Sequence, residues 1–197
     1  MFDLNKIKFA DDLTVKLLTV EKWGFSNGID YFDKQFFKPV QNEGRKVEGC
    51  LWTSPVKSEY SWIDYIRSCE IRNYAKNEYY ELCFKQGTRI AMIENYNDLL
   101  NMPYYDEEKY CHIQSRYIDF EKLATVCDCL WVTTDGLLLA SYPERTLGTA
   151  FLQREPHIIE FNLYGWDCET VLIFNPDCVL NVRNKIKQNN NQLEKAY

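Results

Sequence analysis

Glycine is scarce in this sequence and is never clustered. The eight glycines are scattered over 197 residues, and neither a G-x-G-x-x-G nor a G-x-x-x-x-G-K pattern occurs. Loops of those two kinds bring backbone N–H groups against the phosphates of a nucleotide. We therefore expect no glycine-rich phosphate loop, and the sequence shows no internal repeat.

Histidine is scarcer still, and the cysteines are mostly far apart. Only His112 and His157 occur, and the one close pair among eight cysteines is Cys127 and Cys129. No spacing resembles a zinc site, so we expect no metal. The N-terminal residues contain no apolar signal core, which argues against export and disulfides. Several cysteines lie in apolar runs, where a free thiol behaves as a small core residue.

Long apolar runs and long basic runs are also missing. No apolar run approaches the about 20 residues of a membrane span, so we expect a soluble, cytoplasmic protein without a membrane partner. The body of the chain has no lysine or arginine block, and 29 acidic against 23 basic residues give a net charge of -6. Non-specific nucleic-acid binding needs a basic footprint and is therefore disfavoured.

Aromatic residues, by contrast, are abundant. Fourteen Tyr, eleven Phe and five Trp make up 15% of a chain that is 46% apolar. Tyr and Trp in such numbers typically line a cleft or a contact surface, which favours a binding protein with a protein partner or acceptor. We expect one domain over residues 1–182 and a flexible, polar C-terminal tail over residues 183–197.

The pattern of short elements predicts the fold class. Short strands are separated by turn signals, and the helices are too few to cover both faces of a parallel sheet. The expected fold is therefore α+β, with a curved, mostly antiparallel pair of sheets and short peripheral helices. Strands are expected at 13–20, 50–54, 79–84, 89–95, 129–133, 137–140, 157–161 and 171–174, and helices begin after Ser61, Asn97 and Asp119.

The connections between these elements are predicted from turn chemistry. Residues 85–88, with Gly87, are expected to join strands 79–84 and 89–95 as a pair, and residues 134–136 to form a turn. The polar stretch 41–46 is expected to be a mobile loop, and the acidic, tyrosine-rich stretch 104–110 an exposed loop.

Two acidic residues stand at the start of the apolar strand Val171–Phe174. Asp167 and Glu169 share a parity, so both carboxylates face one side if the extended conformation already begins at Asp167. Such pairs serve acid/base chemistry or hold a hydroxyl or a cation. The alternative is that both are ordinary solvated residues.

A second informative block runs from Gly49 to Pro55. The strand Cys50–Ser54 ends in the hydroxyl residues Thr53 and Ser54, and Ser61 is positioned to cap a helix with Trp62 on its apolar face. The alternative interpretation of Thr53 and Ser54 is a β-branched strand residue and a turn serine.

Together the two blocks resemble the ADP-ribosyltransferase fold, a split β-sandwich that binds NAD. That family carries an Arg or His on its first strand, a hydroxyl motif on a later strand, and a late E-x-E or Q-x-E before an apolar strand. Trp52-Thr53-Ser54 resembles the hydroxyl motif, and Asp167-Cys168-Glu169 resembles the acidic motif. The expected first strand offers only Lys16 and Lys22 in place of Arg or His.

The resemblance implies roles for these residues. Glu169 would hold the nicotinamide ribose hydroxyl while positive charge develops on the ribose. Asp167 takes the place of the acid or amide that selects the acceptor, and Thr53 and Ser54 would brace the ribose and the carboxylate. NAD is then the substrate, and the residues expected to contact it are Trp52, Thr53, Ser54, Tyr60 and Trp62.

The two blocks are also similar to uncharacterised proteins of phages and their bacterial hosts, and this resemblance implies a location in the cytoplasm of a bacterial host cell. This similarity leaves a second function open. The chain could be a non-catalytic, phage-encoded inhibitor of a host defence protein that acts through its acidic, tyrosine-rich surface. A net negative charge steers association with basic partners.

Overall fold

A computed structural model describes residues 3–10, 18–21, 34, 37–43, 46–55, 57–61, 64–65, 68, 79–109, 113–141, 163 and 166–183. Helices in this part of the chain are short, and strands predominate. The helical elements are η1 (Leu4–Lys6), α2 (Tyr96–Leu100), α3 (Phe120–Ala124), α4 (Thr134–Ser141) and η4 (Pro176–Cys178). The strands are β1 (Leu18–Glu21), β2 (Gln41–Glu43), β3 (Lys46–Glu48), β4 (Leu51–Pro55), β5 (Tyr79–Phe84), β6 (Ile90–Ile93), β7 (Tyr104–Lys109), β8 (Ile113–Ile118), β9 (Cys129–Val132), β10 (Thr170–Ile173) and β11 (Val179–Arg183).

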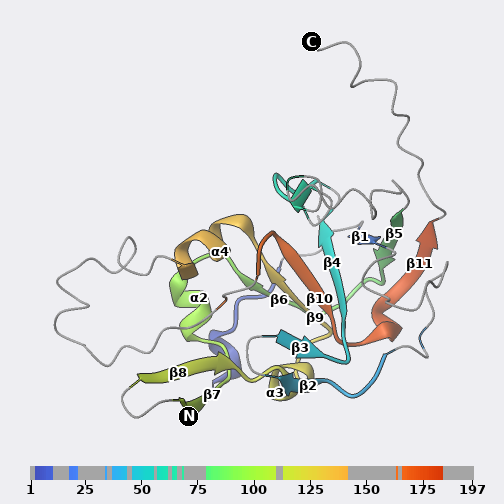
Figure 1. Ribbon diagram of the computed structural model, residues 1–197. Helices are drawn as coiled ribbons and strands as arrows, with labels where there is room; N and C mark the ends of the chain where they lie inside the picture. The colour runs from blue at the N-terminus through green and yellow to red at the C-terminus, as the bar shows by residue number, and fades with distance from the viewer. Residues whose placement is uncertain are drawn as a thin grey trace, which may run out of the picture.

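A seven-stranded sheet in the order β11-β5-β1-β4-β10-β9-β6 forms the centre of the molecule (Figure 1). Each neighbouring pair in it is antiparallel except β6 and β9, which run parallel. The hairpins β2–β3 and β7–β8 are separate two-stranded sheets. The predicted α+β class with mostly antiparallel strands and short helices is therefore confirmed.

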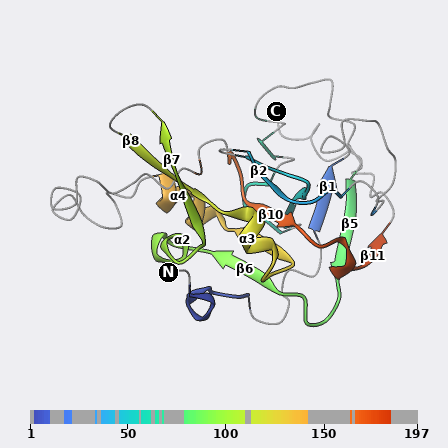
Figure 2. The same ribbon diagram turned by 90° about the horizontal axis from the view of Figure 1, so that it is seen from below.

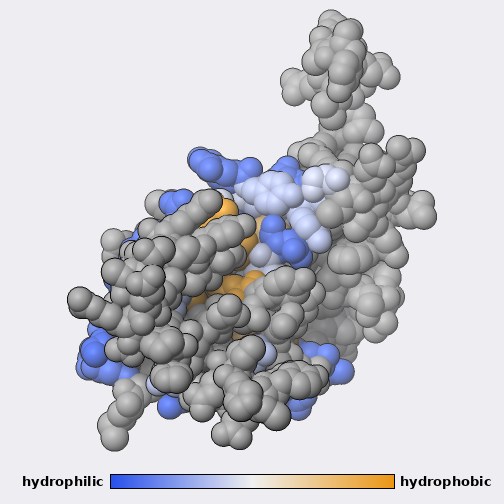
Figure 3. Space-filling model, turned by 60° about the vertical axis from the view of Figure 1, so that its left-hand side comes forward, coloured by the Kyte–Doolittle hydropathy of each residue, from blue (hydrophilic) through white to orange (hydrophobic). Residues whose placement is uncertain are grey.

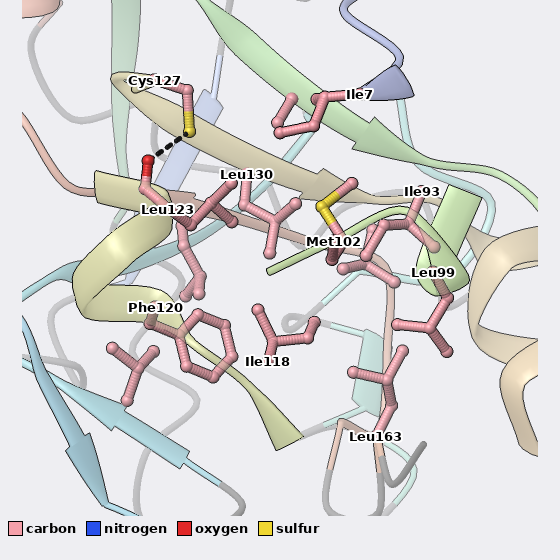
Figure 4. Close-up of a cluster of buried hydrophobic side chains, with 14 of the residues drawn as sticks. Ile7, Ile93, Leu99, Met102, Ile118, Phe120, Leu123, Cys127, Leu130 and Leu163 are labelled. Atoms are coloured by element: carbon pink, nitrogen blue, oxygen red, sulfur yellow. Dashed lines mark hydrogen bonds between the residues drawn. The ribbon is translucent and has the colours of Figure 1, made fainter. Parts of the chain in front are cut away.

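Both faces of the central strands are buried. On β10, Leu172 belongs to one apolar cluster and Val171 and Ile173 to another, and all four residues of the strand are buried. A strand covered on both sides reads as a continuous apolar run rather than an alternating one, which is why this strand was recognisable. In the first cluster, side chains from helices α2 and α3 meet those of the sheet, as Leu99, Leu123 and Leu130 do in Figure 4.

The predicted pairing of residues 79–84 with 89–95 is wrong. Both segments are strands, and Gly87 has the positive φ of 79° expected in a tight turn. However, β1, β4, β10 and β9 lie between β5 and β6 in the sheet. The turn at Gly87 reverses the direction of the chain, but it does not determine which strands pair with β5 and β6. Those partners depend on packing with residues far away in the sequence.

The segment predicted as a turn at 134–136 and a strand at 137–140 is helix α4. Thr133 precedes the helix, and its hydroxyl oxygen accepts a hydrogen bond from the Gly136 N–H at 3.1 Å. A Cβ on Gly136 would lie 2.1 Å from the Ile93 carbonyl oxygen. This glycine therefore permits a close approach of α4 to the end of β6, and its role is not to reverse the chain.

Two predicted loops are strands. Residues 41–43 form β2 and residue 46 begins β3 of the hairpin β2–β3, in which Asn42 accepts a hydrogen bond from the Phe120 N–H at 2.8 Å and donates to Asp119 at 2.9 Å. Asn42 thus helps to cap α3 from outside the helix. The acidic stretch after Pro103 forms β7, paired along its length with β8.

The predicted helix starts are mixed in outcome. Asp119 caps α3 by accepting from the Lys122 N–H. The N-cap of α2 is Asn95 rather than the predicted Asn97, because Asn95 and Asp98 form a reciprocal capping box. Ser61 makes the same kind of reciprocal contact with Asp64: the Ser61 N–H donates to the Asp64 carboxylate, and the Asp64 N–H donates to the Ser61 hydroxyl.

Several expected features lie outside the described residues. These are the strand at 157–161, the first part of the strand at 13–20, Trp62 and residues 184–197. Arg183, expected to open the tail, pairs with Glu81 as the last residue of β11.

Candidate functional site

The hydroxyl motif and the acidic motif are neighbours in the sheet. Strands β4 and β10 pair antiparallel with Thr53 opposite Val171. The Thr53 hydroxyl donates to the Val171 carbonyl at 2.7 Å, and the Ser54 hydroxyl donates to the Glu169 carbonyl at 2.8 Å. Both residues are 1% exposed, and their hydroxyls bind backbone carbonyls in β10 and immediately before it.

Glu169 is a buried carboxylate, with only 8% of the residue exposed. Its Oε2 accepts hydrogen bonds from the hydroxyls of Ser58 at 2.5 Å and Thr134 at 3.3 Å. Its Oε1 accepts from the indole N–H of Trp131 at 2.8 Å. A buried charge is costly unless it is hydrogen-bonded, and these three donors supply that compensation. Within the described part of the chain, no cation forms a salt bridge to this carboxylate.

The three donors come from three different segments. Ser58 follows β4, Trp131 lies in β9, and Thr134 is the first residue of α4. The Glu169 N–H also donates to the Tyr60 carbonyl at 3.1 Å. In Figure 1 these segments meet where β4 ends and β10 begins, beside α4. We call Glu169, Ser58, Trp131 and Thr134 the Glu169 cluster.

The sequence did not single out Trp131 or Thr134 for this cluster. Trp131 reads as an ordinary member of an apolar strand, and Thr134 was expected in a turn. Nothing in the local pattern distinguishes either residue from a structural one. Their contact with Glu169 arises because β9 lies beside β10 in the sheet.

Asp167 and Glu169 occupy different environments. Strand β10 begins at Thr170, and Cys168 lies in a bend, so the extended conformation does not reach back to Asp167. The Thr170 hydroxyl donates to the Cys168 carbonyl at 2.9 Å within this bend. Asp167 is exposed to solvent, whereas Glu169 is buried. The condition for two carboxylates on one strand face is therefore not met.

The aromatic candidates are divided between the core and the surface. The Trp52 ring lies 4.9 Å from that of Trp166, at an angle of 57°, and packs against the first apolar cluster. Tyr60 is 36% exposed, and its hydroxyl is 2.9 Å from the Ser68 hydroxyl. Of the two aromatic candidates that the structure describes, Trp52 is half-buried and contributes to packing, and Tyr60 is the more exposed.

The thiol between the two acids is buried, which disfavours its reactive thiolate form. Burial raises the pKa of Cys168 to about 12, so at neutral pH it is protonated. Burial likewise raises the pKa of Cys50 and of Cys127 to about 12. The six cysteines that the structure describes are free thiols, and four of them are buried. Among the described residues, no three His, Cys, Asp or Glu side chains are grouped to hold a metal ion.

Comparisons of the chain with models of known families, with curated proteins and with solved structures find no match. In the described part of the chain, no helix has the length and apolar character that crossing a membrane requires.

Proposed function

We propose that this chain is an ADP-ribosyltransferase-like protein that transfers ADP-ribose from NAD to a macromolecular acceptor, with Glu169 as its catalytic carboxylate. One observation carries the proposal. The two motifs that resemble that family are 115 residues apart in sequence, and a hydrogen bond from Ser54 to the Glu169 backbone joins them directly. The late acid of the motif is also the one buried and oriented by side-chain donors.

The chemistry of the transfer needs a fixed negative charge. Cleavage of the bond between ribose and nicotinamide develops positive charge on the ribose, and a preorganised carboxylate stabilises that charge. The Ser58, Trp131 and Thr134 donors are neutral, so they orient Glu169 without neutralising it. In this proposal Thr53 and Ser54 act through the backbone of β10, and exposed Asp167 faces the acceptor.

The proposed fold is the curved, split β-sandwich of that family. In support, β4 lies between two groups of strands: β1, β5 and β11 on one side, and β10, β9 and β6 on the other. Figure 2 shows β1, β5 and β11 side by side at one end of the molecule, away from β6.

The test is incubation of the protein with labelled NAD and bacterial extract. Glu169→Gln keeps the shape of the side chain and removes its charge. Loss of one such electrostatic group typically costs about 3 kcal/mol in the barrier, or on the order of a hundredfold in rate. The matched control is Glu48→Gln, an exposed residue of β3, which should transfer label like the wild type. Absence of transfer by the wild type, or full activity of Glu169→Gln, would contradict the proposal.

The hairpin β7–β8 favours a second candidate, a non-catalytic inhibitor of a host defence protein. Its strand β7 has the sequence Tyr-Tyr-Asp-Glu-Glu-Lys and pairs with β8 apart from the central sheet. Tyr104 is 43% exposed, and the Tyr105 ring stacks on that of Tyr117 with centroids 5.7 Å apart. Figure 1 shows the hairpin projecting from the sheet, and an acidic projection favours a basic site on a partner.

The inhibitor candidate is tested by a pull-down from host lysate at two salt concentrations. The wild type should retain one stoichiometric partner more strongly at low salt, because salt screens charge attraction. Replacement of Asp106, Glu107 and Glu108 by their amides should release that partner. If no stoichiometric partner is retained, the inhibitor candidate is wrong.

A further inference from the structure

The hydrogen bonds to the Glu169 carboxylate are unequal. Ser58 donates at 2.5 Å and Trp131 at 2.8 Å, whereas Thr134 donates at 3.3 Å, the longest contact of the cluster. Ser58 and Thr134 share the same oxygen, Oε2. A hydroxyl donor at 3.3 Å is beyond the usual range of O–H···O bonds, so its contribution is the weakest of the three.

The two shorter bonds are also better supported. The Ser58 hydroxyl accepts from the Tyr60 N–H at 3.2 Å while it donates to Glu169, so it is held from two sides. The Trp131 ring packs against the second apolar cluster. Thr134 is half-buried at the start of α4, at the margin of the cluster.

Only 8% of Glu169 is exposed, and its Oε2 already accepts two hydrogen bonds, so a ligand hydroxyl that binds to Oε2 must displace the hydroxyl of Ser58 or Thr134. Displacement of Thr134 costs the least free energy, because its hydrogen bond is the longest and, among the residues that the structure describes, no second hydrogen bond holds its hydroxyl in place. A ligand hydroxyl that donates to Oε2 in its place leaves the carboxylate as well satisfied as before. Figure 3 shows the side of the molecule turned forward from the left of Figure 1, where apolar surface is visible between polar and grey residues.

We infer that the Thr134 hydroxyl holds the position on Glu169 that a ligand hydroxyl takes, which makes Thr134 a specificity residue of the site. The ligand class is then a riboside with a hydroxyl beside the reacting bond. This inference rests on the proposed function. It adds that the site is occupied by the protein's own hydroxyl until such a ligand displaces it.

The test measures binding of two probes to the full chain by calorimetry. The first is a carbocyclic NAD analogue, which keeps both hydroxyls of the nicotinamide ribose ring but cannot be cleaved. The second is the same analogue without the 2′-hydroxyl. Thr134→Val removes the competing hydroxyl and nearly preserves the side-chain shape. One hydrogen bond is worth a net of about 0.5–1.5 kcal/mol, and the long Thr134 bond lies at the low end of that range, so the Kd for the first probe should fall about twofold.

The controls separate this effect from a general change in the protein. The Kd for the deoxy probe should be the same in the wild type and in Thr134→Val, because that probe has no hydroxyl to place on Oε2. Thr125→Val makes the same chemical change at the C-cap of α3, where the hydroxyl donates to the Lys122 carbonyl at 2.7 Å, and should alter neither Kd. Thr134→Ala is the second variant if Thr134→Val does not fold, and it should show the same gain.

The outcomes distinguish the inference from the proposal beneath it. If the wild type binds neither probe, the proposed function and the inference are both overturned. If the wild type binds the first probe but Thr134→Val and Thr134→Ala bind it no more tightly, the Thr134 inference alone is overturned.

Discussion

The hydrogen bond between Trp131 and Glu169 should contribute measurably to folding. Trp131→Phe removes the indole N–H that Oε1 accepts at 2.8 Å and keeps a ring in the same place. A hydrogen bond to a charged group is worth about 1.5–3 kcal/mol, and the smaller ring adds about 1 kcal/mol of lost packing. We therefore expect the free energy of unfolding to fall by about 2.5–4 kcal/mol.

A double-mutant cycle with Glu169→Gln isolates the contribution of charge. The glutamine amide oxygen can still accept from the indole, while its NH₂ faces the Ser58 and Thr134 hydroxyls, which can rotate to accept. The cycle thus measures the difference between a charge-assisted and a neutral bond, about 1 kcal/mol. The assay is urea unfolding followed by far-UV circular dichroism, because removal of a tryptophan changes the fluorescence.

Trp52→Phe is the matched control for this cycle. Trp52 is also half-buried, but it packs against the first apolar cluster, whereas Trp131 packs against the second. Its effect should add to that of Glu169→Gln within about 0.5 kcal/mol. If Trp131→Phe and Glu169→Gln are equally additive, the indole does not stabilise the carboxylate and the reasoning about the Glu169 cluster fails.

Two further predictions concern α4 and the buried thiols. Gly136→Ala should lower the free energy of unfolding by at least about 3 kcal/mol, because its Cβ would lie 2.1 Å from the Ile93 carbonyl oxygen, beyond what ordinary overpacking costs. Gly87→Ala should cost only about 1–2 kcal/mol, because Gly87 has a φ of 79° but open space around its Cβ position. If urea unfolding showed that Gly87→Ala is the more destabilising of the two variants, the packing of α4 on β6 would be contradicted. Burial raises the pKa of Cys127 to about 12, so the unfolded chain loses the thiol proton at a lower pH than the folded chain does. The free energy of unfolding should therefore fall as the pH rises from about 9 towards 12, by up to about 1.4 kcal/mol per pH unit. Urea midpoints measured in reductant at about pH 8.5 and about pH 10.5 should show a smaller fall for Cys127→Ala, and an equal fall in both proteins would refute the assignment.

The sequence by itself determined the features that depend on a few neighbouring residues. Val171–Ile173 was recognisable as a buried strand because its apolar run is uninterrupted. Asp119 was recognisable as a cap because its carboxylate reaches an N–H three residues away. The turn at Gly87 was recognisable because few other residues adopt a positive φ. The α+β class followed from these short, local signals taken together.

Only the tertiary structure decided which strands pair and what surrounds Glu169. The donors to its carboxylate are 111, 38 and 35 residues away in the sequence, at Ser58, Trp131 and Thr134. Local patterning cannot specify such partners, because many strands offer similar apolar faces and the order β11-β5-β1-β4-β10-β9-β6 depends on packing across the whole core. The same holds for α4: its apolar residues predict a strand, whereas the structure has a helix there, with Gly136 packed closely against Ile93. The residues of the candidate site were thus partly visible in the sequence, but their geometry comes from long-range packing.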